Sequence, residues 1–97
     1  MNRLQLVATV VECQPLRYTP AGVPVLDLVL EHAGDVVEAG QTRHVELTLP
    51  TIAIGDLARM MARTPLGTTL RIDGFLAPTR KGATRLRLHL QQAATLD

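Results

Sequence analysis

Apolar residues recur at every second position in several short stretches of this chain, and proline or glycine separates the stretches. A two-residue period places alternate side chains on opposite faces of a β-strand, so each stretch has one face for a core and one for solvent. The clearest stretch covers residues 85–90. In it, leucines alternate with Arg85, Arg87 and His89. The pattern predicts an all-β domain with a basic face on its last strand.

Five stretches are predicted as strands, at about residues 3–10, 25–30, 44–49, 70–76 and 85–90. The second is almost wholly apolar, as in a central strand that is covered on both faces. Gly74 predicts a bulge or bend in the fourth. Pro50 and Pro78 are expected to end the third and fourth strands, because proline lacks the N–H that a sheet ladder needs.

Loops are expected at about residues 14–23, 33–42 and 78–83, where prolines, glycines or acidic residues gather. A short helix is expected over residues 56–63, between the third and fourth strands. Asp56 is its candidate N-cap, since a carboxylate can accept the free N–H groups of a first turn.

Three strands, a short helix and two strands are the order of an OB-fold, a five-stranded Greek-key barrel. Residues 1–97 suffice for one hydrophobic core, so a single domain is expected. An SH3-like barrel is the alternative, since strand order alone does not define how a barrel closes. The helix and the long early loops favour the OB-fold.

The net charge of +1 hides an uneven distribution. Acidic residues gather in the predicted loop at 33–42 and just before it, whereas residues 74–96 carry basic residues and no acidic one. Those basic residues are Arg80, Lys81, Arg85 and Arg87. The hairpin at 78–83 places the first two at its tip, and the corresponding loop of OB-folds helps to clasp oligonucleotides. Guanidinium groups bind phosphate, so these residues are candidate nucleic-acid contacts; a solvated hairpin edge protected by charge is the alternative.

Several classes of protein are not expected. Cys13 is the only cysteine, which rules out an intramolecular disulfide and fits the reducing cytoplasm. His32, His44 and His89 fall on different predicted strands without the spacing of a metal site. The chain has no phosphate-cradling glycine loop and no nucleophile motif, so neither an enzyme nor a cofactor is expected. No apolar run approaches the roughly 18 residues that span a bilayer.

A set of short segments falls in the order of one known family. It begins with Asn2-Arg3-Leu4, Pro15-Leu16-Arg17, Pro20-Ala21-Gly22-Val23-Pro24 and Leu30-Glu31-His32. It continues with Glu38-Ala39-Gly40, Arg43, Pro50, Gly67-Thr68, Gly74-Phe75 and Leu88-His89. Over almost its whole length the chain thus resembles the primosomal replication protein N (PriB) family. The resemblance implies an OB-fold homodimer that binds single-stranded DNA at stalled forks and cooperates with the restart helicase PriA; DnaT is a further candidate partner.

The candidate DNA-binding residues combine the basic cluster with positions that the resemblance places on the DNA-binding surface. They are Arg17, Tyr18, Arg43, His44, Arg80, Lys81, Arg85 and Arg87.

Single-strand binders usually stack bases on aromatic rings, and members of the family that this chain resembles can carry such rings around residues 41–46. This chain has only His44 there as a partial platform, beside Glu46, which would repel phosphate in the same groove. Tyr18 is interpreted either as a stacking residue or as packing beneath the first loop. We therefore expect binding mainly through phosphates; a protein adaptor for the helicase, with weak DNA binding, is the alternative. Dimerisation is expected on the side of the first strand.

Overall fold

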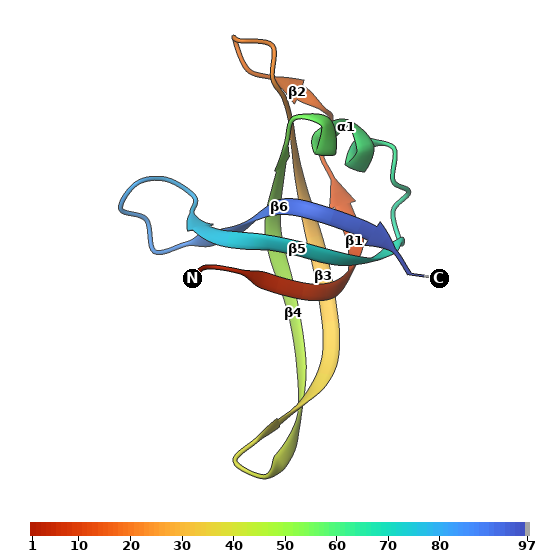
Figure 1. Cartoon of the computed structure of the whole chain (residues 1–97), viewed down its shortest axis with the longest axis vertical. Coiled ribbons are helices and arrows are strands. Elements are labelled where there is room, and N and C mark those ends of the chain that lie inside the picture. The colour runs from red at the N-terminus through yellow and green to blue at the C-terminus, as the bar shows by residue number, and fades with distance from the viewer. Residues whose placement is uncertain (97) are drawn as a thin grey trace.

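The computed structural model describes residues 1–96, whose strands form a closed barrel (Figure 1). The barrel strands are β1 (Leu4–Cys13), β3 (Pro24–Glu38), β4 (Gln41–Ile54), β5 (Thr69–Pro78) and β6 (Leu86–Thr95). They pair in the order β1, β5, β6, β4, β3, and β3 returns to β1. Within this ring β4 and β6 are parallel and the other pairs antiparallel. Helix α1 (Asp56–Ala62) lies between β4 and β5, as the OB-fold order predicted.

The first loop contains a further strand. β2 (Arg17–Tyr18) pairs with β3 outside the ring of barrel strands, with Arg17 opposite Val25 and Tyr18 opposite Pro24. The expected loop at 14–23 is therefore partly ordered against the barrel, which fixes the position of Arg17.

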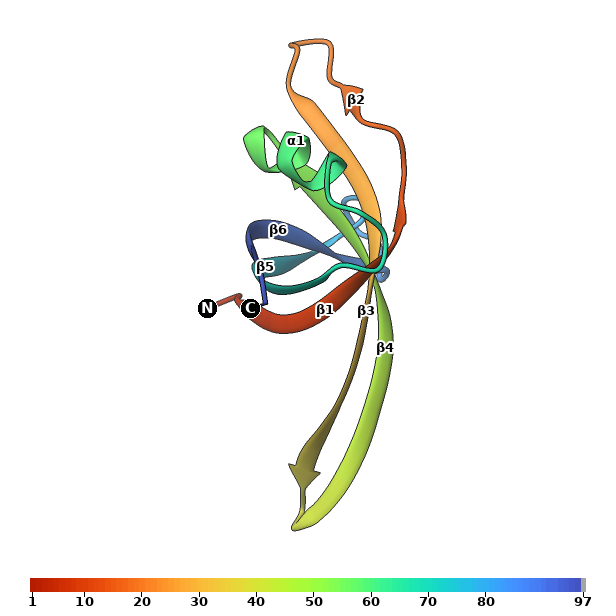
Figure 2. The same ribbon diagram turned by 90° about the vertical axis from the view of Figure 1, so that its right-hand side faces the viewer.

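β3 and β4 extend beyond the barrel as a two-stranded arm, residues 31–48 (Figure 2). Their pairing continues without a shift to Glu38 opposite Gln41, so the prediction of a loop at 33–42 is wrong. The turn consists of Ala39 and Gly40, with φ of 52° and 77°, as in the tight turns that suit hairpins. Sequence reasoning missed these strands because the arm lies beyond the core, where no apolar alternation is required.

Pro50 does not end its strand, contrary to the prediction, since β4 continues to Ile54. The carbonyl of Asp27 in β3 accepts the Gln14 N–H on the side away from β4. Hydrogen-bonding groups alternate in direction along a strand, so Val29 also faces away from β4. Pro50 lies opposite Val29, so no hydrogen bond from an N–H of residue 50 to β3 is needed. A proline can therefore occupy this position within the strand.

Asp56 begins helix α1 but is not its N-cap, so that prediction is also wrong. Gly55 is the N-cap residue, with φ of 81°, and within residues 1–96 no side chain caps the first turn. The Asp56 carboxylate instead accepts a hydrogen bond from the Arg59 guanidinium at 2.8 Å. Ala58 and Met61 are buried, and they anchor the helix to the barrel core.

The core is aliphatic, as the scarcity of aromatic residues required. Leu26, Leu28 and Leu30 of β3 meet Leu88 and Leu90 of β6 within it. Because side chains alternate, the residues between these leucines point out of the barrel. The register of β5 and β6 shifts between Asp73 and Gly74, which confirms the predicted bulge, and Pro78 is the last residue of β5, as predicted.

Gly74 is the position at which added volume should be least tolerated. A Cβ there would collide with the backbone carbonyl of His89, which belongs to the paired strand β6. Since a ladder atom cannot move aside freely, we expect Gly74→Ala to lower the free energy of unfolding by about 1 to 3 kcal/mol, measured by urea denaturation. Gly34→Ala is the control, because its methyl group meets only the imidazole of His32. A Gly74→Ala protein as stable as the wild type would contradict the close approach of the two strands.

Candidate nucleic-acid interface

A groove of about 520 Å³ lies on the outside of the barrel, across β3, β4 and β6. Val29 and Pro50 contribute the strand surface at its centre. Gln14 adjoins it from the first loop, and Thr79 and Arg85 from the loop between β5 and β6. The second and third barrel strands together with these two loops are the oligonucleotide-binding surface of OB-folds. The groove is therefore the candidate site.

The loop between β5 and β6 is the basic wall of the groove and projects from the barrel (Figure 1). The Thr79 N–H donates to the Arg85 carbonyl and the Ala83 N–H to the Arg80 carbonyl, both at 3.0 Å. These bonds hold Arg80 and Lys81 exposed at the tip, where the sequence placed them. Among residues 1–96, none of the four basic side chains of this region, Arg80, Lys81, Arg85 and Arg87, is paired with a carboxylate.

Arg87 links the loop to the strand surface. It points outward from β6 next to Leu88, lines the groove and is half-buried. Its Nε is buried and has no hydrogen-bond partner within the described chain. Buried donors are usually satisfied, and a phosphate oxygen is a strong acceptor for a guanidinium group.

Arg17 stands on the opposite side of the groove. Its guanidinium donates to the Asp27 carboxylate at 2.9 Å, and Asp27 lines the groove. The side chain of Arg17 is 54% exposed, so most of its remaining donors face solvent. Tyr18 is 57% exposed, which excludes the interpretation that it packs beneath the loop.

Arg43 and His44 lie on the arm and are engaged by carboxylates rather than gathered at the groove. Arg43 donates to Glu38 at 2.7 Å. His44 contacts Asp35 through Nδ1 at 2.8 Å and Glu46 through Nε2 at 3.2 Å. The hydrogen bond to Asp35, followed by that to Glu46, raises the pKa of His44 above its usual 6.5.

The outward face of the arm continues the face of the groove. The β3–β4 register is unbroken, so Glu46 alternates onto the same side as Pro50, and Glu31 onto the same side as Val29. Glu46 thus lies on the face of the groove but is not among the residues that line it. The outward face of the arm is therefore acidic, apart from the charge that His44 carries when protonated.

Sequence reasoning missed one pair of rings beside the groove. Phe75 and His89 are partners across β5 and β6, and their rings stack with centroids 4.8 Å apart and planes inclined by 13°. Burial, followed by the charge of Arg87, lowers the pKa of His89 below 6.5. Only the register of two strands joined by a loop brings these residues together, so no local pattern signals the pair.

Residues 1–96 include no helix long and apolar enough to cross a membrane. In the same part of the chain, no three His, Cys, Asp or Glu side chains are grouped as a metal site requires. Cys13 is half-buried, and its burial raises the pKa of the thiol, as is common for a cysteine that packs as a small apolar side chain.

The two histidines should titrate in a fixed order. We expect His44 to titrate above pH 6.5 and His89 below it, because carboxylates stabilise the first imidazolium whereas burial and Arg87 destabilise the second. Proton NMR of the imidazole signals measures both values, and His44→Gln and His89→Gln variants assign them, because His32 gives a third signal. Asp35→Asn should move the His44 value back toward 6.5 and leave that of His89 unchanged. Titration of both rings at one pH would contradict the two environments.

Comparison with known proteins agrees with this geometry. Residues 2–92 match a family model described as another single-strand binding protein family. The replication restart protein PriB of Bordetella pertussis is 56% identical over 93 residues, which are 96% of this chain and 87% of that protein. The structure of PriB from Ralstonia solanacearum has a TM-score of 0.88 at 40% identity, over 98% of this chain and 97% of that one. A single-stranded DNA-binding protein of Thermus aquaticus shares the fold, with a TM-score of 0.77 at 24% identity over 100% of this chain and 51% of that one. The resemblance is thus confirmed, and the chain belongs to the PriB family of OB-fold single-strand binding proteins.

Proposed function

We propose that this protein binds single-stranded DNA in the groove between its two loops, mainly through phosphate contacts. The observation that carries the proposal is the set of basic side chains at one wall of the groove, none of which pairs with a carboxylate of residues 1–96. Arg85 and Arg87 line the groove itself, and Arg80 and Lys81 extend from the loop above it. Phosphate neutralisation releases counterions and supplies affinity that does not depend on base identity.

The family supports a role in replication restart. Relatives with this fold are named as replication restart proteins and as single-stranded DNA-binding proteins. We propose that this chain is an accessory protein of the restart primosome in the cytoplasm, where it cooperates with the helicase PriA. DnaT is a further candidate partner.

The salt dependence of binding tests the phosphate contacts. We expect the affinity for oligo-dT to fall with salt at a log-log slope of about −0.7 per phosphate neutralised. Arg80→Ala combined with Lys81→Ala should weaken binding to every sequence and flatten that slope by up to about 1.4, since two contacts are lost. Fluorescence titrations at several salt concentrations measure both quantities.

The matched control removes two charges elsewhere. Arg59→Ala with Arg63→Ala changes the net charge equally but alters the helix α1 region, away from the groove residues. It should change the slope much less. Equal effects of the two double variants would show that overall charge, rather than the loop, governs binding.

A role as a protein adaptor is the second candidate, and the arm favours it. The arm presents exposed carboxylates beside exposed apolar residues, with Val36 50% and Val37 74% exposed. Such a surface suits a protein partner better than a phosphate backbone. Tight binding of PriA without measurable binding of oligo-dT in the same buffer would favour this function over the first.

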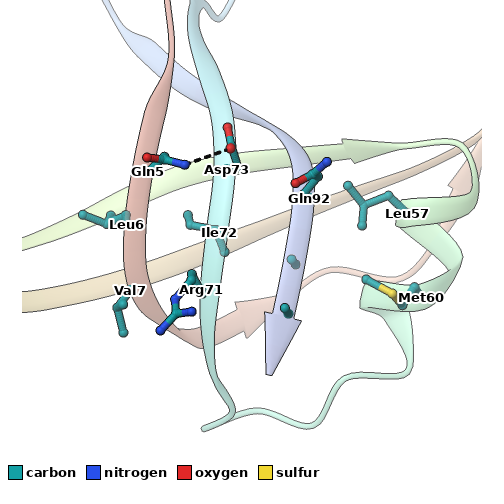
Figure 3. A pocket seen from close by; sticks show the side chains of 11 residues that line it. Gln5, Leu6, Val7, Leu57, Met60, Arg71, Ile72, Asp73 and Gln92 are labelled. Carbon is teal, nitrogen blue, oxygen red and sulfur yellow. Dashed lines mark hydrogen bonds between the residues drawn. The ribbon is translucent and has the colours of Figure 1, made fainter. Parts of the chain in front are cut away.

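We further propose a homodimer formed along β1. Residues 4–8 pair with β5 on one edge, whereas β1 meets β3 only from Thr9 onward. On the open edge, the Val7 carbonyl is contacted by His32 at 2.7 Å. A hollow of about 680 Å³ extends from β1 over β5 and β6 to α1. In Figure 3, Val7 lies on β1 and Met60 on α1. Open strand edges beside apolar surface are sites at which a second chain can add.

Sedimentation equilibrium tests the dimer. We expect a dimer at tens of micromolar, an estimate well above typical specific dissociation constants. Val7→Glu should produce a folded monomer, because Val7 is 41% exposed and a carboxylate there would be buried at the interface. A wild-type monomer at that concentration would contradict the proposed interface.

A further inference from the structure

The stacked rings of Phe75 and His89 lie on the outside of the barrel. Leu88 and Leu90, on either side of His89, are buried in the core, and Leu76 next to Phe75 packs against the core, so the two rings point outward. Both rings are half-buried, which leaves part of each in contact with solvent. The pair is therefore a fixed aromatic surface and not part of the core.

This surface adjoins the groove through the strand ladder. His89 lies beside Ile52 of β4, and Ile52 lies opposite Asp27 of β3. Asp27 lines the groove, so one row of residues leads across the barrel from the groove to the two rings. Arg87 belongs to both regions, since it lines the groove and its charge acts on the His89 imidazole.

The charges on the outward face favour a polyanion that runs from the groove toward β5 rather than toward the arm. From the groove toward the arm, the outward face carries Glu31, Glu46 and Asp35. From the groove toward β5, it carries Arg87 and then the two rings. A phosphate backbone is repelled in the first direction and attracted in the second.

We propose that Phe75 and His89 form a stacking platform for one nucleobase of the strand whose phosphates Arg87 and the loop hold. This inference rests on the proposed DNA-binding function and adds to it a contact with a base. Every nucleobase has a π-face, so the platform accepts any base. It would supply part of the stacking that the aromatic-poor arm cannot.

The salt dependence separates stacking from phosphate contact. We expect Phe75→Leu to weaken binding of a dT oligomer about 5-fold at every salt concentration, with an unchanged slope, because stacking releases no counterions. Phe75→Tyr keeps the ring and should bind like the wild type. On an abasic oligomer of the same length, Phe75→Leu and the wild type should bind equally.

A second measurement needs no variant, in case Phe75→Leu perturbs the fold. Irradiation of the wild-type protein with a 5-iodouracil oligomer should crosslink a base to Phe75 or His89, identified by mass spectrometry. Crosslinks confined to the arm, or Phe75→Leu binding dT as tightly as the wild type, would overturn the platform. If the Arg80 and Lys81 double variant still weakens binding in that case, the proposed function stands without the platform. If wild-type protein fails to bind dT, the proposed function fails as well.

Discussion

The short parallel pairing of β4 with β6 holds the rest of this structure in place. Thr51 lies beside Leu88 and Ile52 beside His89, and these contacts close the barrel. Closure commits the leucines of β6 to the core, and alternation then directs Arg87 and His89 outward. Without the pairing, β6 would lie at the edge of an open sheet, and its basic residues would have no fixed relation to β3 and β4. The groove exists because closure sets the two loops on either side of it.

Sequence reasoning succeeded where one face of a strand meets the core. The leucines of β6 revealed a strand and its outward face, and the two glycines and one proline in residues 74–82 located the bulge and the hairpin tip. It failed where local rules compete with tertiary structure. Residues 33–42 lack alternation because the arm has no core to face, and Pro50 is tolerated because its missing N–H points away from β3. At Gly55, a left-handed backbone replaces the side-chain cap expected from Asp56.

The candidate site shows a second limit of the sequence. Arg43 and Arg85 are equally basic in the sequence, but hairpin register places a carboxylate against Arg43, and His44 is likewise held by carboxylates, whereas within residues 1–96 none pairs with Arg85 or Arg87. Phe75 and His89 become a stacked pair only through the register of β5 with β6. A residue type indicates what chemistry a side chain can perform, whereas the pairing of strands decides whether that side chain is available to perform it.

We propose that DNA lies across the groove toward β5 and β6 and leaves the arm free. Backbone amide chemical shifts of ¹⁵N-labelled protein, followed during addition of oligo-dT, show where the strand lies. We expect the largest changes in residues 79–89 and 14–17, whereas residues 35–44 at the end of the arm should change little. Large changes confined to the arm, with residues 79–89 unaffected, would contradict this proposal.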